Sequence, residues 1–146
     1  MSFNNTLAKF CYPESLITEN DHWYTLLRPE QITFGSLILI SKNEKNSSFS
    51  NLRTYEQTEM FHAIQKIEKA AFNKMGCNKI NYLALMMVDP FVHFHVLPRF
   101  KKTMVFNNIE FLDPGYPGLA DFSHKTSLKE SEFLDMVQYL KGFFVE

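Results

Sequence analysis

The segment from Val92 to Phe100 constrains the fold more than any other part of the chain, because apolar and polar side chains alternate along it until a Pro-Arg pair. Such alternation is typical of a β-strand with one buried face. Side chains two residues apart on a strand point the same way, so His93 and His95 should share a face, roughly 6.5–7 Å apart. Val92, Phe94 and Val96 should fill the opposite face. One strand is therefore expected to supply both a core layer and a polar site.

Three other segments have strand composition, and two have the spacing of amphipathic helices. Residues 23–27, 35–40 and 80–88 are rich in apolar and aromatic side chains, and 35–40 is almost continuously apolar, which favours a central strand. Apolar residues recur every three or four positions across Tyr55–Lys74, the clearest helix pattern in the chain, and again across Ser127–Gly142. These patterns predict a structure that mixes strands with two helices.

Short polar signals predict where the helices begin and end. Thr54 with Gln57, and Ser127 with Glu130, have the spacing of a capping box, in which two side chains satisfy free N–H groups of the first turn. Gly76 follows the long helix pattern, where a residue in the left-handed region commonly ends a helix.

The order of these segments predicts one α+β domain over residues 1–146. Residues 20–102 should form its core, a mostly antiparallel sheet of about five strands with the long helix packed across it. Residues 103–146 should form a turn-rich segment and a C-terminal helix. The Asp89-Pro90 turn between the last two core strands predicts an antiparallel hairpin whose tip lies beside the histidines.

Charge and cysteine content limit the partners and the compartment. A formal net charge of −1 gives no global reason to expect binding to nucleic acid or to a membrane, so local groups must hold any anionic ligand. Cys11 and Cys77 are too few for a disulfide framework and lack metal-site spacing, which predicts free thiols. Since no segment has the apolar length of a signal peptide or a membrane span, we expect a cytoplasmic protein. The 15 phenylalanines predict an aromatic core or a subunit interface.

The two histidines can support phosphoryl chemistry. An unperturbed imidazole, with a pKa of about 6.5, is mostly neutral near pH 7 and can attack phosphorus through the nitrogen that lacks a proton. This attack divides one displacement into two easier steps, provided that an acceptor holds the other ring nitrogen. His93 is the candidate nucleophile. His95 is the candidate donor to a phosphate oxygen, or the carrier of a proton to the leaving group.

Spacing alone leaves two other interpretations of this pair open. Two histidines at alternate strand positions can simply form a solvated face. A His-x-His pair is also a common half-site for a metal, but a third ligand is needed and Asp89 is the nearest acid along the chain. The other histidines, His22, His62 and His124, are scattered, and we predict no metal site.

The histidine strand resembles that of a known protein family. The order His93-Phe94-His95-Val96-Leu97-Pro98-Arg99 resembles the second half of the signature of the histidine triad (HIT) superfamily, and residues 35–40 resemble its Pro-Gly-His-hydrophobic strand. The resemblance covers roughly residues 23–100. It implies a nucleotide-binding hydrolase or transferase in which the middle histidine, here His93, attacks the α-phosphorus and forms a nucleotidyl-histidine intermediate.

The chain departs from that family in three places. Aligned through the Pro-Arg ending, the first histidine of the triad falls on Phe91, and Ser36 stands where many members have another histidine. The usual Gly-Gln loop before the triad is shortened to residues 88–90. The resemblance gives His95 the place of the third histidine, and we expect His95, Ser36 and Arg99 to bind substrate phosphates.

The resemblance also implies the substrate class and the assembly. Suitable substrates are a dinucleoside polyphosphate or a nucleoside phosphoramidate, with no cofactor and with magnesium only where a polyphosphate carries it. Members pair through the long helix and an edge strand, which implies a homodimer. Because Phe91 replaces a catalytic ring, the alternative is a nucleotide-binding protein with little or no catalytic activity.

Overall fold

The centre of the structure, a computed structural model that describes residues 2–145, is a five-stranded antiparallel sheet in the order β1-β2-β4-β6-β5. Its strands are β1 (Leu16–Glu19), β2 (Trp23–Leu27), β4 (Leu37–Ser41), β5 (Lys79–Leu83) and β6 (His93–Arg99). Two short antiparallel pairs lie outside it, β3 (Glu30–Gln31) with β9 (Thr126–Ser127), and β7 (Met104–Phe106) with β8 (Ile109–Phe111). The expected α+β fold is confirmed.

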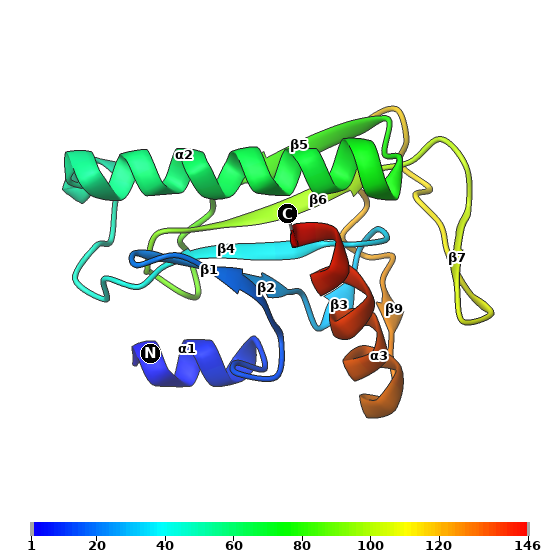
Figure 1. Cartoon of the computed structure of the whole chain (residues 1–146), viewed down its shortest axis with the longest axis horizontal. Helices are drawn as coiled ribbons and strands as arrows, with labels where there is room; N and C mark the ends of the chain where they lie inside the picture. The colour runs from blue at the N-terminus through cyan, green and yellow to red at the C-terminus, as the bar shows by residue number, and fades with distance from the viewer. Residues whose placement is uncertain (1, 146) are drawn as a thin grey trace.

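Helices cover both faces of the sheet (Figure 1). They are α1 (Phe3–Lys9), α2 (Thr54–Glu68), which continues as a π-helical segment over Lys69–Met75, and α3 (Glu130–Lys141). Single 3-10 turns span Phe49–Asn51 and Gly142–Phe144. The long helix crosses one face beside α3, whereas α1 lies against the other face. The histidine strand therefore has a helical layer on each side.

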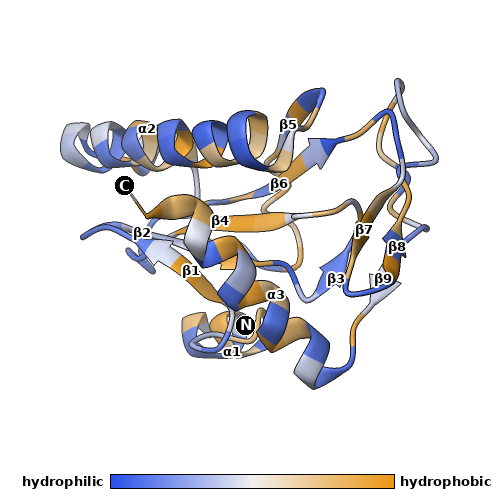
Figure 2. Cartoon of the chain, turned by 45° about the vertical axis from the view of Figure 1, so that its right-hand side comes forward, coloured by the Kyte–Doolittle hydropathy of each residue, from blue (hydrophilic) through white to orange (hydrophobic). Residues whose placement is uncertain are grey.

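The larger core lies between the sheet and the layer of α2 and α3. Leu37 and Leu39 of β4 face this layer and contact Ile67 of α2 and neighbouring apolar side chains, all of them fully buried. Each such side chain contributes about 1.5–3 kcal/mol through its burial. Every residue of β4 is buried, as expected for a central strand, and Figure 2 shows β4 in the hydrophobic colour.

A smaller apolar cluster lies on the opposite face, under α1. Leu26, Ile38 and Ile40 point from the sheet toward Leu7 and Phe10 at the end of α1. The sequence analysis did not predict α1, because a helix of seven residues carries too little periodicity to stand out. This helix matters to the site because it covers the face that carries the histidines.

The strand predicted at residues 80–88 is shorter than expected. β5 ends at Leu83, and residues 84–92 form a loop in which Leu85, Met87 and Val88 are exposed by 56–82%. The prediction was wrong because apolar composition imitates a strand, whereas Met86 has a positive φ of 45° that breaks the extended backbone. The hairpin itself is confirmed, since β5 pairs antiparallel with β6.

Both capping predictions were displaced by a residue or more. The helix α2 begins after Arg53, whose N–H donates to the Glu56 carboxylate at 3.0 Å, and α3 begins after Lys129, whose N–H donates to Glu132 at 2.8 Å. Glu56 and Glu132, one and two positions away, accept the capping hydrogen bonds that were expected of Gln57 and Glu130. The predicted end is confirmed, since Gly76 lies in the left-handed region with a φ of 75°.

Candidate active site

The register of the sheet places both histidines on the face that α1 covers. His93 pairs with Ile40 of β4 and His95 with Ile38, and the two isoleucines belong to the cluster under α1. The centroids of the imidazole rings are 5.3 Å apart. The two rings therefore adjoin on one side of one strand, as the alternation predicts.

The hydrogen bond of His93 determines which ring nitrogen is available. Its Nδ1 lies 2.7 Å from the carbonyl oxygen of Phe91, and the residue is only 3% exposed. Because a carbonyl oxygen only accepts hydrogen bonds, we assign the proton to Nδ1. Nε2 then carries the lone pair. The Phe91 carbonyl is therefore the acceptor that a nucleophilic histidine requires on its other ring nitrogen.

Phe91 contributes to this region in two separate ways. Its backbone carbonyl orients His93, as described above. Its side chain is buried in the cluster under α1, where it makes an edge-to-face contact with Phe3 at a centroid distance of 5.1 Å. The ring therefore holds α1 against the sheet, while the backbone contributes to the site.

His95 is held on its other side by an arginine. The Arg28 Nε–H donates to His95 Nδ1 over a long distance of 3.4 Å, which assigns the ring proton to Nε2. Burial, with the charge of Arg28 as a further cause, lowers the pKa of His95 to about 4. At pH 7 this ring is neutral, so it can donate one hydrogen bond from Nε2–H to a phosphate oxygen or to a leaving group.

The helix α1 is tied to the loop before β6. Asp89 in that loop is buried, accepts a hydrogen bond from Thr6 Oγ1 at 2.9 Å and forms an ion pair with Lys9. Burial alone would raise the pKa of Asp89, but the bonds from Lys9 and Thr6 outweigh it and lower that pKa. Phe10, next along the chain, has its ring centroid 6.0 Å from that of His93. The end of α1 is thus fixed over the candidate nucleophile.

Comparison with known proteins identifies the fold but no nearer relative. No protein-family model matches the chain, and no curated protein does. Among solved structures, a histidine triad protein from Marinobacter aquaeolei VT8 is 17% identical with a TM-score of 0.68, and covers 89% of this chain and 90% of its own. One from Sinorhizobium meliloti 1021 is 20% identical with a TM-score of 0.66, over 85% of this chain and 87% of its own. A hypothetical histidine triad nucleotide-binding protein from Sulfolobus tokodaii strain7 is 10% identical with a TM-score of 0.66, over 89% and 83%.

The chain has the histidine triad fold. Within this fold, two residues expected to bind phosphate are engaged elsewhere. The fully buried Ser36 hydroxyl accepts from the Thr33 N–H at 2.9 Å and donates to the Thr33 carbonyl at 2.8 Å, which closes the turn before β4. The Arg99 guanidinium donates to both carboxylate oxygens of Asp113, at 2.7 and 2.8 Å, and to Asn81 at 2.8 Å. Phosphate binding by either side chain would require these bonds to break.

Three side chains beside the histidines were missed by the sequence analysis. Arg28 and Lys9 supply positive charge. The centroid of the Phe122 ring lies 6.2 Å from that of the His95 ring and 5.8 Å from Cζ of Arg28. Arg28 is 67 residues from His95 along the chain. The one signal in the sequence was that Arg28 directly follows the strand predicted at residues 23–27, which in the structure lies next to β4.

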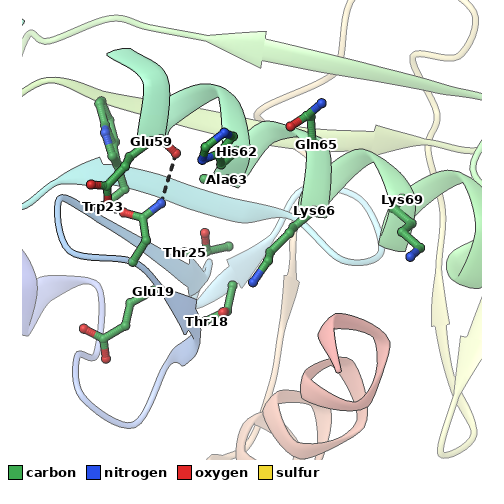
Figure 3. Close-up of a pocket in the computed structure, with 11 residues that line it drawn as sticks. Thr18, Glu19, Trp23, Thr25, Glu59, His62, Ala63, Gln65, Lys66 and Lys69 are labelled. Carbon is green, nitrogen blue, oxygen red and sulfur yellow. Dashed lines mark hydrogen bonds between the residues drawn. The ribbon is translucent and has the colours of Figure 1, made fainter. Parts of the chain in front are cut away.

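The cavity in Figure 3 is separate from this site. It has a volume of about 650 Å³ and lies between α2 and the strands β1 and β2, where Trp23 and Thr25 form part of its lining. These residues belong to the α2 face of the sheet, opposite the histidines. Within residues 2–145, no three His, Cys, Asp or Glu side chains group as a metal site, and no helix is long and apolar enough to cross a membrane.

Proposed function

We propose that this chain is a nucleotide-binding hydrolase or nucleotidyltransferase of the histidine triad type, with His93 as its nucleophile. The observation that carries the proposal is the bond from His93 Nδ1 to the Phe91 carbonyl, since it leaves the lone pair on Nε2. The fold supports it, because the solved structures of this fold include one described as nucleotide-binding.

The two histidines divide the chemistry between them. Nε2 of His93 forms an N–P bond to the α-phosphorus as the bond from phosphorus to the leaving group breaks, and the neutral His95 donates a hydrogen bond from Nε2–H to that group, which takes its proton from water. Water or another acceptor then attacks phosphorus and the N–P bond breaks. This releases a nucleoside monophosphate and restores His93. A dinucleoside polyphosphate and a nucleoside phosphoramidate both suit this sequence of steps, and neither needs a protein-bound cofactor.

The experiment measures AMP release from a diadenosine polyphosphate and from an adenosine phosphoramidate. We expect release from the wild type and none from His93→Ala, because only covalent attack needs this ring. His62→Ala is the matched control, since His62 is exposed on α2 beside the cavity of the opposite face. Equal activity in His93→Ala and the control would exclude the nucleophile assignment.

One observation favours a second candidate, a protein that binds nucleotides with little turnover. His93 is only 3% exposed, and the centroid of the Phe10 ring lies 6.0 Å from that of its imidazole, so little of the His93 ring is open to a substrate. A ligand that binds only the folded state raises stability, so AMP should raise the melting temperature while neither substrate is cleaved. Turnover at rates typical of enzymes, of about 1 per second or more, would exclude this candidate.

We also propose a homodimer joined through α2 and β5. β5 is an edge strand, and Phe61 of α2 and Phe72 of the π-helical segment that continues it are exposed by 57% and 42%. Light scattering after gel filtration should give the mass of a dimer, and Phe61→Glu should shift it toward the monomer because a charge there would be buried. A monomeric wild type would contradict this proposal.

A further inference from the structure

Arg28 has a position and a set of contacts that a structural role does not explain. It follows β2, is half-buried, and donates from Nε to His95 and from one terminal nitrogen to the Glu30 carbonyl at 2.6 Å. Phe122 covers one face of the guanidinium. The side chain is thus held beside the candidate catalytic ring.

No carboxylate lies within ion-pair distance of Arg28 among residues 2–145. The nearby Glu30 carboxylate pairs with Lys125 at 2.7 Å instead. Arg99 shows the contrast, since this buried arginine has a carboxylate on two of its nitrogens. A sheltered guanidinium without a counter-ion is suited to bind an anion, because arginine offers several donors in a planar fork that matches phosphate oxygens.

A small cavity adjoins this guanidinium. It has a volume of about 110 Å³ and is lined by Lys9, Phe10, Arg28, Pro29 and Glu30. Two of these residues also contact the histidines, Phe10 at the ring of His93 and Arg28 at His95. The cavity therefore opens beside the place where a phosphate would lie, with two cationic side chains on its wall.

We propose that Arg28, with the charge of Lys9 nearby, binds a second anionic group of the substrate and thereby selects its leaving group. This rests on the proposed function and makes it more specific. A leaving group that begins with a further phosphate meets the guanidinium, whereas the uncharged amine of a phosphoramidate does not. The site therefore prefers a dinucleoside polyphosphate over a nucleoside phosphoramidate.

The expected effect is large because the interaction is charged and sheltered from water. Loss of one hydrogen bond to a charged group lowers affinity or transition-state stabilisation on the order of 10- to 100-fold. Because Arg28→Gln loses the bond to His95 with either substrate, kcat/KM for a diadenosine polyphosphate should fall by this factor beyond whatever kcat/KM for an adenosine phosphoramidate loses. For Arg28→Lys, kcat/KM for the polyphosphate should lie between the values of the wild type and Arg28→Gln, because lysine keeps the charge but lacks the planar set of donors.

The matched control is Arg53→Gln, which removes an exposed arginine at the start of α2 and keeps the backbone N–H that caps the helix. It should leave both rates unchanged. Circular dichroism of each variant establishes that the chains are folded before rates are compared. An equal loss on both substrates, or no loss on the polyphosphate, would overturn the inference while leaving the nucleophile assignment standing.

A binding measurement separates this inference from failure of the proposed function. Inorganic tripolyphosphate, which has no nucleoside and needs no turnover, should raise the melting temperature of the wild type and of Arg53→Gln but not of Arg28→Gln. If the wild type cleaves neither substrate and this difference is still found, the catalytic proposal fails and the anion site stands. If all three proteins respond equally to tripolyphosphate, Arg28 is not the anion site.

Discussion

Replacing Asp113 tests whether Arg99 serves the fold or a substrate. The two side chains are 4% and 2% exposed and share a bidentate ion pair. One Asp113 oxygen also accepts the Phe100 N–H at 3.3 Å, so the carboxylate joins the end of β6 to the segment after β8. Asp113→Ala removes all three bonds and leaves the guanidinium buried with Asn81 as its remaining partner.

The cost follows from the burial of the pair. Breaking a buried ion pair by removing one partner typically costs about 3–5 kcal/mol, because the other charge stays in the interior without compensation. With a slope near 2 kcal/mol per molar urea, which lies in the usual range for a domain of this size, the unfolding midpoint should fall by about 1.5–2.5 M. This loss is a large share of the 5–15 kcal/mol by which domains are typically stable.

Urea denaturation followed by tryptophan fluorescence is a suitable assay, since Trp23 is buried in the core. The control is Lys125→Gln, which breaks an exposed ion pair with Glu30 and should cost below about 1 kcal/mol. The double variant Arg99→Met/Asp113→Leu should lose less stability than Asp113→Ala, because it leaves no unpaired charge. A loss below about 1 kcal/mol in Asp113→Ala, equal to the control, would refute the reasoning and reopen phosphate binding by Arg99.

Two further predictions concern stability. The pKa of His95 is about 4 when folded and about 6.5 when unfolded, so the unfolded chain binds more protons between these pH values and stability should fall as pH drops from 6.5 to 4. A plot of melting temperature against pH should be flatter over this window for His95→Gln than for the wild type. His62→Gln is the control and should keep the slope of the wild type. If His95→Gln also keeps that slope, the prediction is contradicted. Glu56→Ala should cost about 2–3 kcal/mol in urea unfolding, because this buried carboxylate caps α2 and accepts from Asn46 at 2.8 Å. Glu132→Ala, at the less buried cap of α3, should cost about 0.5–1 kcal/mol, and equal losses would show that burial does not set the cost.

The apolar patterns of the sequence predicted those helices and strands whose formation depends on nearby residues. The helix over residues 54–75 follows from its apolar spacing and its glycine end, and β4 from its continuous apolar run. The same reliance on composition extended β5 past Leu83, since the exposed Leu85 and Met87 look like strand residues when read along the chain. Pairing decides where a strand ends, and pairing is not a local property.

The environment of the site depends on contacts between distant segments. Alternation placed His93 and His95 together, but the bond from Arg28 to His95 joins residues 67 positions apart. Arg99 shows the converse, because alternation put it on the histidine side while Asp113, 14 positions later, engages its guanidinium. A strand pattern gives the direction of a side chain, whereas the partner that it meets is set by the tertiary fold.

Phe91 brings these two lessons together. The resemblance in sequence aligns this side chain with the first histidine of the triad, which predicts that a catalytic ring is absent. The structure supplies orientation from the backbone, since the Phe91 carbonyl accepts the Nδ1 proton of His93. Any residue at this position offers that carbonyl, provided that the backbone keeps its course. The phenylalanine ring secures that course by packing against Phe3 of α1 in the cluster that covers the histidine face. The ring of Phe91 is therefore an apolar anchor outside the site, while its carbonyl holds the Nδ1 proton of His93 and leaves the lone pair of that ring on Nε2.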